Sequence, residues 1–143
     1  MAIRFDFPRI PGFTKKQSAE WLFQVALSEG ASIERLTYKA FGSKEMIALN
    51  MQFLNHDYDT DIITFAESEA PLPISADFAL GWDQIALQSR ELGEPLLREL
   101  HRILVHGLLH CIGYDDRTDE QRLKIRAKED YYLATHPECS TWN

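Results

Sequence analysis

Two histidines four residues apart, followed by a glycine and two aspartates, stand out in the stretch HGLLHCIGYDD, residues 106–116. On an α-helix, positions four apart differ by about 40° in rotation and about 6 Å in rise, so His106 and His110 project from the same side. Two imidazoles placed in this way can bind one cation, as in the zinc-helix pattern H-x-x-x-H. Gly113 follows where a left-handed turn can reverse the chain, and Asp116 comes three residues later. The spacing predicts a zinc site made of His106, His110 and Asp116, with a fourth position left open.

Other polar residues around this stretch compete for a place in the site. Asp115 is the alternative to Asp116, which we prefer because of its spacing from the glycine. Cys111 lies about 100° round the helix from its neighbouring histidine, so we expect it to pack rather than to bind metal. His101 also lies off the ligand face, and we expect Glu99 to stabilise the start of the helix rather than to support the ligands.

The ligand spacing matches that of the metzincin proteases, which makes a zinc metalloprotease one hypothesis. That mechanism needs a glutamate beside the first histidine as a general base, and Gly107 occupies this position. A second alternative is a factor without catalytic activity in which the metal is structural. Structural zinc sites are typically closed by four protein ligands, however, and this pattern supplies three.

The stretch HGLLHCIGYDD resembles the signature of the YbeY family of metal-dependent endoribonucleases. NMQFLNHDYDTDIITF, residues 50–65, and SADFALGWDQI, residues 75–85, are similar to two further blocks of that family. The resemblance extends from about residue 50 to residue 133. It implies a small cytoplasmic α/β protein with one zinc ion, acting as a single-strand-specific endoribonuclease in maturation of the 16S ribosomal RNA 3′ end and in ribosome quality control. The implied partners are single-stranded or ribosomal RNA and the ribosome or its proteins.

The resemblance also implies roles for individual residues. It assigns the zinc ligands to His106, His110 and position 116, with a water molecule activated by the metal as nucleophile or base at the phosphodiester. It places Thr60 and Asp61 near the cleft, although a threonine and an aspartate there are equally typical of a turn at the start of a strand. Asp77 begins the predicted strand at 77–81, where an acidic residue can either orient a ligand or simply face water.

Two positions depart from the family pattern. The family normally has histidine as its third ligand, where this chain has Asp116. Aspartate oxygen is an accepted zinc ligand, and its harder character relaxes the preference for zinc over other divalent ions. Leu54 follows Phe53 where the family usually has arginine, a natural clamp for phosphate. Either another basic residue serves, or phosphoryl transfer is slow.

Candidates to replace this arginine are the basic residues that are frequent directly after the histidine stretch. The interpretation we favour is that they alternate with acidic residues on a solvated helix face. Among them, Arg117, adjacent to the proposed third ligand, is the first candidate to test for a substrate contact. The basic residues are Arg117, Arg122, Lys124, Arg126 and Lys128, and the acidic ones are Asp119, Glu120, Glu129 and Asp130.

Helical periodicity and capping signals predict five helices. Their expected ranges are 14–30 with a Thr14–Gln17 capping box and Gly30 at the end, 43–55 capped by Ser43, 83–92 capped by Asp83, 95–111 with Pro95 at the first helical position, and 118–133 with a Thr118–Gln121 capping box. β-Branched and aromatic residues predict strands at 3–7, 35–41, 61–66 and 77–81. Residues 66–76, rich in proline and polar residues, are expected to form a loop. Interleaved strands and helices indicate an α/β fold with one small, mixed four-stranded sheet.

Composition limits the classes of protein that this chain can represent. Its 143 residues fit a single domain over residues 1–143. The net charge of −7 argues against a surface that binds nucleic acid everywhere, but leaves room for a local basic patch. Cys111 and Cys139 make no disulfide framework, and the sequence contains neither a secretory signal nor a membrane-spanning run, so we expect a cytoplasmic protein with no membrane contact. The C-terminal HPECSTWN gives no functional signal.

Overall fold

The fold was analysed in a computed structural model, which describes residues 2–56 and 58–142. This part of the chain forms four strands, five α-helices and a short 3₁₀ helix, which confirms the predicted α/β fold with one mixed sheet. None of the helices described is both long and apolar enough to span a membrane. The elements are β1 (Ala2–Asp6), α1 (Lys15–Ser28), β2 (Ile33–Phe41), α2 (Ser43–Leu54), β3 (Ile62–Ser68), β4 (Ile74–Gly81), α3 (Trp82–Leu92), α4 (Leu96–Ile112), α5 (Asp119–Leu133) and the 3₁₀ helix Cys139–Thr141.

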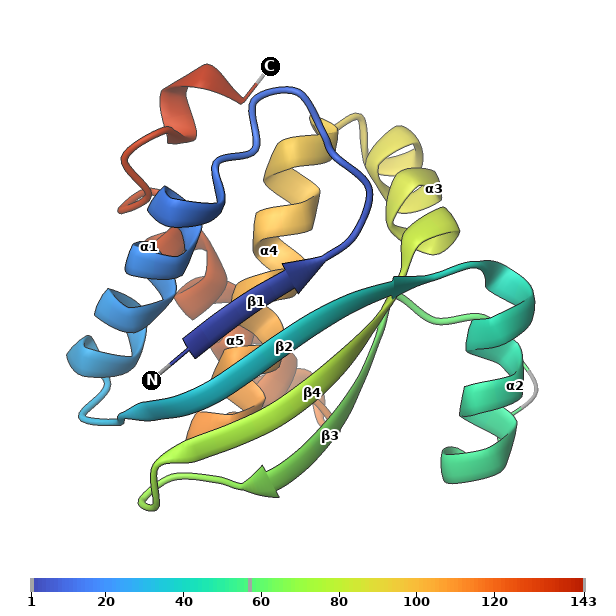
Figure 1. Cartoon of the computed structure of the whole chain (residues 1–143), viewed down its shortest axis with the longest axis horizontal. Coiled ribbons are helices and arrows are strands. Elements are labelled where there is room, and N and C mark those ends of the chain that lie inside the picture. The colour runs from blue at the N-terminus through green and yellow to red at the C-terminus, as the bar shows by residue number, and fades with distance from the viewer. Residues whose placement is uncertain (1, 57, 143) are drawn as a thin grey trace.

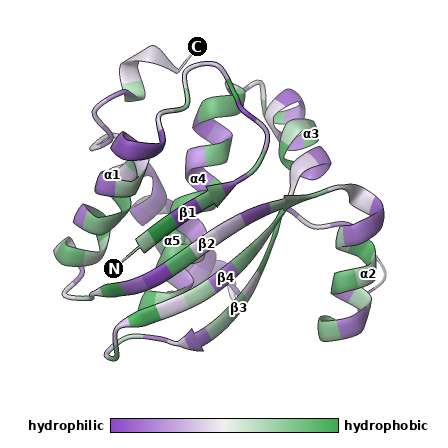
Figure 2. Cartoon of the chain, viewed as in Figure 1, coloured by the Kyte–Doolittle hydropathy of each residue, from purple (hydrophilic) through white to green (hydrophobic). Residues whose placement is uncertain are grey.

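The strands lie in the order β1-β2-β4-β3 (Figure 1). β2 pairs in parallel with both β1 and β4, whereas β3 runs antiparallel to β4 at the edge of the sheet. Hydrophobic residues are interspersed with hydrophilic ones along the strands (Figure 2), and successive side chains point to opposite faces of the sheet. The main core includes Tyr38 and Phe78 from one face of the sheet. On the other face, Met46 of α2 packs over Ile63 and Ala79.

Helix α4 is the central helix, and it contacts α1, α3, α5 and the sheet. It packs tightly on the sheet at Gly107, where a Cβ atom would lie 2.7 Å from Cε1 of Phe78 and 2.9 Å from Cδ1 of Ile62. Only a residue without a side chain lets the helix pack at this distance. Position 107 therefore faces the sheet, whereas the neighbouring His106 is only half-buried.

The predicted capping of the helices is confirmed at α5 and wrong at α1. Thr118 and Gln121 form the complete capping box of α5. Thr14 occupies the N-cap position of α1, but its side chain makes no capping bond. Its hydroxyl donates instead to Oε2 of Glu138 (3.0 Å), so a contact with the C-terminal segment replaces the local cap.

The starts of α2, α3 and α4 also differ by one or two residues from the expectation. Gly42 is the N-cap of α2, and Ser43 is its first helical residue. Asp83 lies in the first turn of α3 rather than at its cap, and its Oδ2 accepts hydrogen bonds from the backbone N–H (3.0 Å) and the hydroxyl (3.2 Å) of Ser43. Pro95 precedes α4 as its N-cap. An aspartate on one helix thus caps another, which local sequence cannot show.

The predicted loop at 66–76 is wrong at both ends, because β3 extends to Ser68 and β4 begins at Ile74. Polar residues there pair across the hairpin, where the hydroxyl of Ser68 donates to the carbonyl of Pro73 (2.6 Å) and accepts from the N–H of Ser75 (3.1 Å). The backbone N–H of Ala70 donates to the carbonyl of Cys111 (3.1 Å). The tip of the hairpin is thereby attached to the end of α4.

The C-terminal segment packs on α1 and α4 through a buried group of histidines. Ser18 lies with its hydroxyl 2.8 Å from Nε2 of His101 and 3.1 Å from Nε2 of His136. The indole of Trp142, which is 4% exposed, stacks on His101 at 4.1 Å between ring centroids. His101 therefore has a structural role, as its position off the ligand face suggested.

We predict that this histidine group makes the fold sensitive to acid. Burial lowers the pKa of His101 from 6.5 to about 3 and that of His136 to about 4. The unfolded chain takes up protons below pH 6.5 that the folded chain does not, so stability is complete above this pH and falls as the pH drops towards 4. Each histidine lowers the free energy of unfolding by up to about 1.4 kcal/mol for each pH unit in this range. Urea unfolding between pH 7 and 4.5 should show a flatter dependence for the double variant His101→Gln/His136→Gln, and identical slopes would contradict the prediction.

We also predict that Gly107→Ala destabilises the protein by about 1–3 kcal/mol, because the added methyl group overlaps Phe78 and Ile62. Chemical unfolding at neutral pH measures the change. The control is Lys124→Ala at an exposed position of α5, which should change the free energy of unfolding by less than about 0.5 kcal/mol. Equal stability of the glycine variant and the parent protein would show that α4 can move away from the sheet without loss.

Candidate metal centre and its cleft

Three side chains converge at the C-terminal end of α4 and the turn that follows it. The Nε2 atoms of His106 and His110 lie 3.1 Å apart. Oδ2 of Asp116 lies 3.5 Å from the first of these nitrogens and 3.4 Å from the second. All three residues are half-buried, and they form the group that could hold a metal ion within the described part of the chain.

The size of this triangle fits zinc. Zinc bonds of 2.0–2.1 Å in a tetrahedron place neighbouring ligand atoms about 3.3 Å apart, close to the three distances observed. Two imidazole nitrogens and one carboxylate oxygen are also an accepted donor set for a zinc ion with one open position. Both the spacing and the donor chemistry are therefore suitable for a divalent metal.

Gly113 produces the turn that carries the aspartate back to the histidines. Its φ is +124°, a conformation that residues with a side chain rarely adopt. The turn closes with a hydrogen bond from the N–H of Tyr114 to the carbonyl of Leu109 (3.0 Å). The hydroxyl of Tyr114 donates to Oε1 of Glu29 (2.6 Å) at the end of α1. The turn is thus fixed at both its backbone and its side chain.

A buried carboxylate on α5 orients the first histidine. Oε2 of Glu129, a residue that is 3% exposed, lies 2.7 Å from Nδ1 of His106. The other oxygen of Glu129 accepts from Nη1 of Arg102 (3.2 Å), which is also buried. Because an ionised carboxylate can only accept, Nδ1 donates to it, which leaves Nε2 as the nitrogen that would bind a metal ion.

The same contacts set the charge preference of His106. Burial lowers the pKa of this histidine, but the hydrogen bond to Glu129 and the negative charges of Glu129, Asp61 and Asp116 outweigh burial and raise the pKa above its usual value. Positive charge at the imidazole is therefore favoured. A divalent cation at Nε2 benefits from the same negative surroundings.

A cleft of about 290 Å³ adjoins the triangle. One side consists of Asp61, Gln88 and Glu99, in which the amide of Gln88 donates to Oδ2 of Asp61 (3.3 Å) and Oε2 of Glu99 (3.1 Å). Oε1 of Glu99 is buried without a hydrogen-bond partner, and burial raises the pKa of this carboxyl. The remaining lining residues are Leu92, Arg102, Ile103, His106, Asp116, Arg122, Ile125, Arg126 and Glu129.

The structure places the other predicted residues around this cleft or away from it. Asp61 lines the cleft, whereas Thr60 next to it does not. Asp115 is outside the triangle, and its Oδ2 accepts from Nε (3.0 Å) and Nη2 (2.6 Å) of Arg117. The Arg117 side chain is 82% exposed and does not line the cleft. Asp77 pairs with Arg35 (2.8 Å) on the face of the sheet that is opposite α4.

Two predictions for neighbouring residues have clear outcomes. Cys111 is buried in the core, and burial raises the pKa of its thiol to about 12, which confirms a packing role. Glu99 lies in the first turn of α4, where we expected it to stabilise the helix start, and its buried side chain also lines the cleft.

Sequence reasoning missed Glu129 and Arg102. The solvated face predicted for the charged residues of α5 is wrong for Glu129, which is buried. A signal was present, because Ile125, Glu129, Tyr132 and Leu133 recur at helical spacing and are the buried residues of α5. Nothing in the sequence indicates that Arg102 would be the buried partner of that carboxylate.

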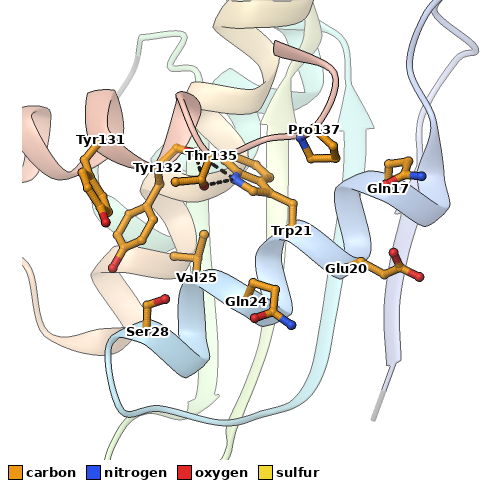
Figure 3. A pocket seen from close by; sticks show the side chains of 10 residues that line it. All are labelled: Gln17, Glu20, Trp21, Gln24, Val25, Ser28, Tyr131, Tyr132, Thr135 and Pro137. Atoms are coloured by element: carbon orange, nitrogen blue, oxygen red, sulfur yellow. Dashed lines mark hydrogen bonds between the residues drawn. The ribbon is translucent and has the colours of Figure 1, made fainter.

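A second hollow, of about 260 Å³, lies between α1 and the end of α5 (Figure 3). Trp21 forms part of its wall, with Nε1 donating to the carbonyl of Tyr132 (2.8 Å) and to the hydroxyl of Thr135 (3.1 Å). Glu20 is the acidic residue that lines this hollow. The hollow shares no lining residue with the cleft beside His106. None of its lining residues belongs to the group that could hold a metal ion within the described residues.

Comparison with known proteins gives a consistent result. The family model described as Endoribonuclease YbeY matches residues 10–136. The protein named Endoribonuclease YbeY from Cytophaga hutchinsonii is 38% identical over 133 residues, covering 91% of this chain and 93% of that protein. The one from Chlorobium limicola is 36% identical over 132 residues, covering 89% and 91%. The solution structure of TM1509 from Thermotoga maritima has a similar fold, with a TM-score of 0.66 at 22% identity over 92% of this chain and 87% of that one.

We predict that Glu129→Gln weakens zinc binding by about 10- to 100-fold, because the amide no longer fixes the proton on Nδ1 of His106. Competition with a chromophoric chelator measures the affinity. Asp130→Asn is the matched control, since Asp130 forms an ion pair with the same Arg102 (2.8 Å) but is not a partner of His106. The control should change affinity by a few-fold at most. Equal effects of both substitutions would mean that the hydrogen bond to His106 contributes nothing specific.

Proposed function

The chain belongs to the YbeY endoribonuclease family, and on that premise we propose that it is a metal-dependent endoribonuclease that cleaves single-stranded RNA. Its substrate in the cell would be ribosomal RNA, in maturation of the 16S 3′ end and in ribosome quality control. The proposed partners are accordingly ribosomal RNA and the ribosome or its proteins, in the cytoplasm. The proposed metal ligands are His106, His110 and Asp116, with one zinc ion per chain or another divalent ion in its place.

One observation carries the proposal. Three ligand atoms at 3.1–3.5 Å from one another face a common point beside a cleft. A three-ligand site keeps one metal position for water or substrate. This arrangement is typical of catalytic metal sites and unlike the closed sites that only stabilise a fold.

Each group of residues has a distinct part in the proposed reaction. A bound zinc ion would supply Lewis acidity, which lowers the pKa of water and offsets charge on phosphoryl oxygens. Glu129 keeps the proton on Nδ1 of His106, so that Nε2 remains a ligand. Asp61 and Glu99 supply carboxylates on the far side of the cleft, and the hydrogen bonds from Gln88 hold both in place.

Peptide hydrolysis by the zincin mechanism is disfavoured both by the absence of a glutamate at position 107 and by the packing of that position. Position 107, where that mechanism has its general base, faces Phe78 and Ile62 at less than 3 Å from a Cβ atom. A glutamate there would be directed into the sheet. The same open ligand set argues against the other alternative, a ribosome-associated factor with a purely structural metal.

We further propose that residues 1–143 act as one domain. The main core takes residues from β1, β2 and β4 and from four helices, so these elements are stabilised together. The ligands come from α4 and the turn before α5, and the orienting carboxylate comes from α5. The site therefore depends on the whole of this core.

The decisive experiment incubates zinc-loaded protein with end-labelled single-stranded RNA. We expect cleavage by the parent protein and none by His106→Ala or Asp116→Ala, because each variant lacks one ligand. Asp116→His should retain cleavage, since histidine is an equally good zinc ligand.

Two outcomes of this experiment would contradict the expected role of the metal site. Equal cleavage by the parent protein and His106→Ala would identify a contaminating nuclease. A parent protein that binds one zinc ion and leaves RNA intact would overturn the endoribonuclease proposal for the isolated chain.

A further inference from the structure

We propose that Arg126 binds a phosphate of the RNA substrate beside the metal centre. This inference rests on the proposed function and names a residue that contacts substrate in the same cleft. It starts from a problem of charge. Asp61, Glu99, Asp116 and Glu129 all line the cleft, so a phosphodiester entering it needs nearby positive charge in addition to the metal.

Position 54 does not supply that charge. Leu54 is a neutral residue at the end of α2, half exposed to solvent, and it does not line the cleft. The cations that line the cleft are Arg102, Arg122 and Arg126. The three differ in how far their guanidinium groups are already engaged.

Arg102 and Arg122 are both committed to contacts within the protein. Arg102 is 4% exposed and pairs with Glu129 (3.2 Å) and Asp130 (2.8 Å), so its charge is neutralised inside the fold. Arg122 donates from Nη1 to the backbone carbonyls of Asp116 (3.1 Å) and Arg117 (3.2 Å) and from Nη2 to Asp119. Its donors stabilise the turn that carries the third ligand.

Arg126 is the arginine whose donors remain available. Its side chain is 50% exposed. Its Nη1 lies 3.9 Å from Oε1 of Glu129, a distance that is too long for a hydrogen bond. Within residues 2–56 and 58–142, its guanidinium has no hydrogen-bond partner. A planar guanidinium with unused N–H groups matches two oxygens of a phosphate at once.

The position of Arg126 connects it to the metal centre. It lies one helical turn before Glu129, whose Oε2 contacts His106 at 2.7 Å. Its charge also reaches the opposite side of the cleft, where it counteracts the rise that burial causes in the pKa of Glu99. A phosphate held by Arg126 would therefore lie within the cleft, next to the residues that bind the metal.

The test compares Arg126→Ala and Arg126→Lys with Lys124→Ala. Lys124 is on the same helix and carries the same charge, but it lies 5.8 Å from the Tyr114 ring, outside the cleft. For zinc-loaded protein and single-stranded RNA, we expect Arg126→Ala to reduce kcat/KM by about 10- to 100-fold. Arg126→Lys should fall between the parent protein and the alanine variant, because it keeps the charge and loses the planar fork. Lys124→Ala should remain within a few-fold of the parent protein.

RNA binding measured by fluorescence anisotropy at several salt concentrations gives an independent readout. Loss of one phosphate contact should reduce the slope of log affinity against log salt by about 0.7 for Arg126→Ala, with an unchanged slope for Lys124→Ala. Zinc stoichiometry is measured for every variant.

Three results would overturn the inference, and they separate it from the proposed function. Equal effects of Arg126→Ala and Lys124→Ala, with RNA cleaved by the parent protein, would reject the role of Arg126 and leave the endoribonuclease proposal intact. Loss of zinc from Arg126→Ala would show that the residue acts through Glu129 rather than on RNA. A parent protein that neither binds nor cleaves RNA would reject both proposals.

Discussion

The hydrogen bond between Glu129 and His106 is the interaction on which the rest of the site depends. An ionised carboxylate that is 3% exposed is costly unless its oxygens are paired. Here one oxygen is paired with His106 of α4 and the other with Arg102 of the same helix. α5 must therefore pack on α4 in the one arrangement that satisfies the carboxylate. That arrangement also directs Nε2 of His106 towards His110 and Asp116.

Two adjacent residues of helix α4 have different roles, one in packing and one in the proposed metal site. Gly107 brings the helix close to Phe78, and this contact contributes to the core. His106, one position earlier, lies on a side that is partly open and holds a proposed ligand. Because neighbouring residues on a helix are about 100° apart, the closely packed residue and the proposed metal ligand lie on different sides of the same turn. The missing glutamate at position 107 is thus a requirement of packing, and not merely an absent catalytic group.

How well the sequence predicted each feature depends on how far apart in the sequence its contacting residues lie. The histidine pair, the reversing glycine and Asp116 lie within eleven consecutive residues, so local geometry was enough to bring them together. The helices and strands were likewise near their observed places, because hydrophobic periodicity is local. Contacts between distant segments were not predictable in this way. Asp83 capping Ser43, the histidine group with Trp142 and the pairing of Glu129 with His106 all join residues separated by 23 or more positions.

The proposed acidic third ligand and the neutral position 54 have a common consequence for the proposed binding of RNA. A divalent ion bound by two neutral imidazoles and Asp116 retains a net charge of about +1, where a third histidine would leave about +2. The metal centre therefore attracts a phosphodiester less strongly than a three-histidine centre would, in a protein whose overall charge is −7. Leucine at position 54 removes a further source of positive charge from that end of α2. The proposed recognition of RNA would then depend on the few cationic groups that the fold leaves unpaired at the cleft, and α5 presents such a group one turn away from the carboxylate that orients His106.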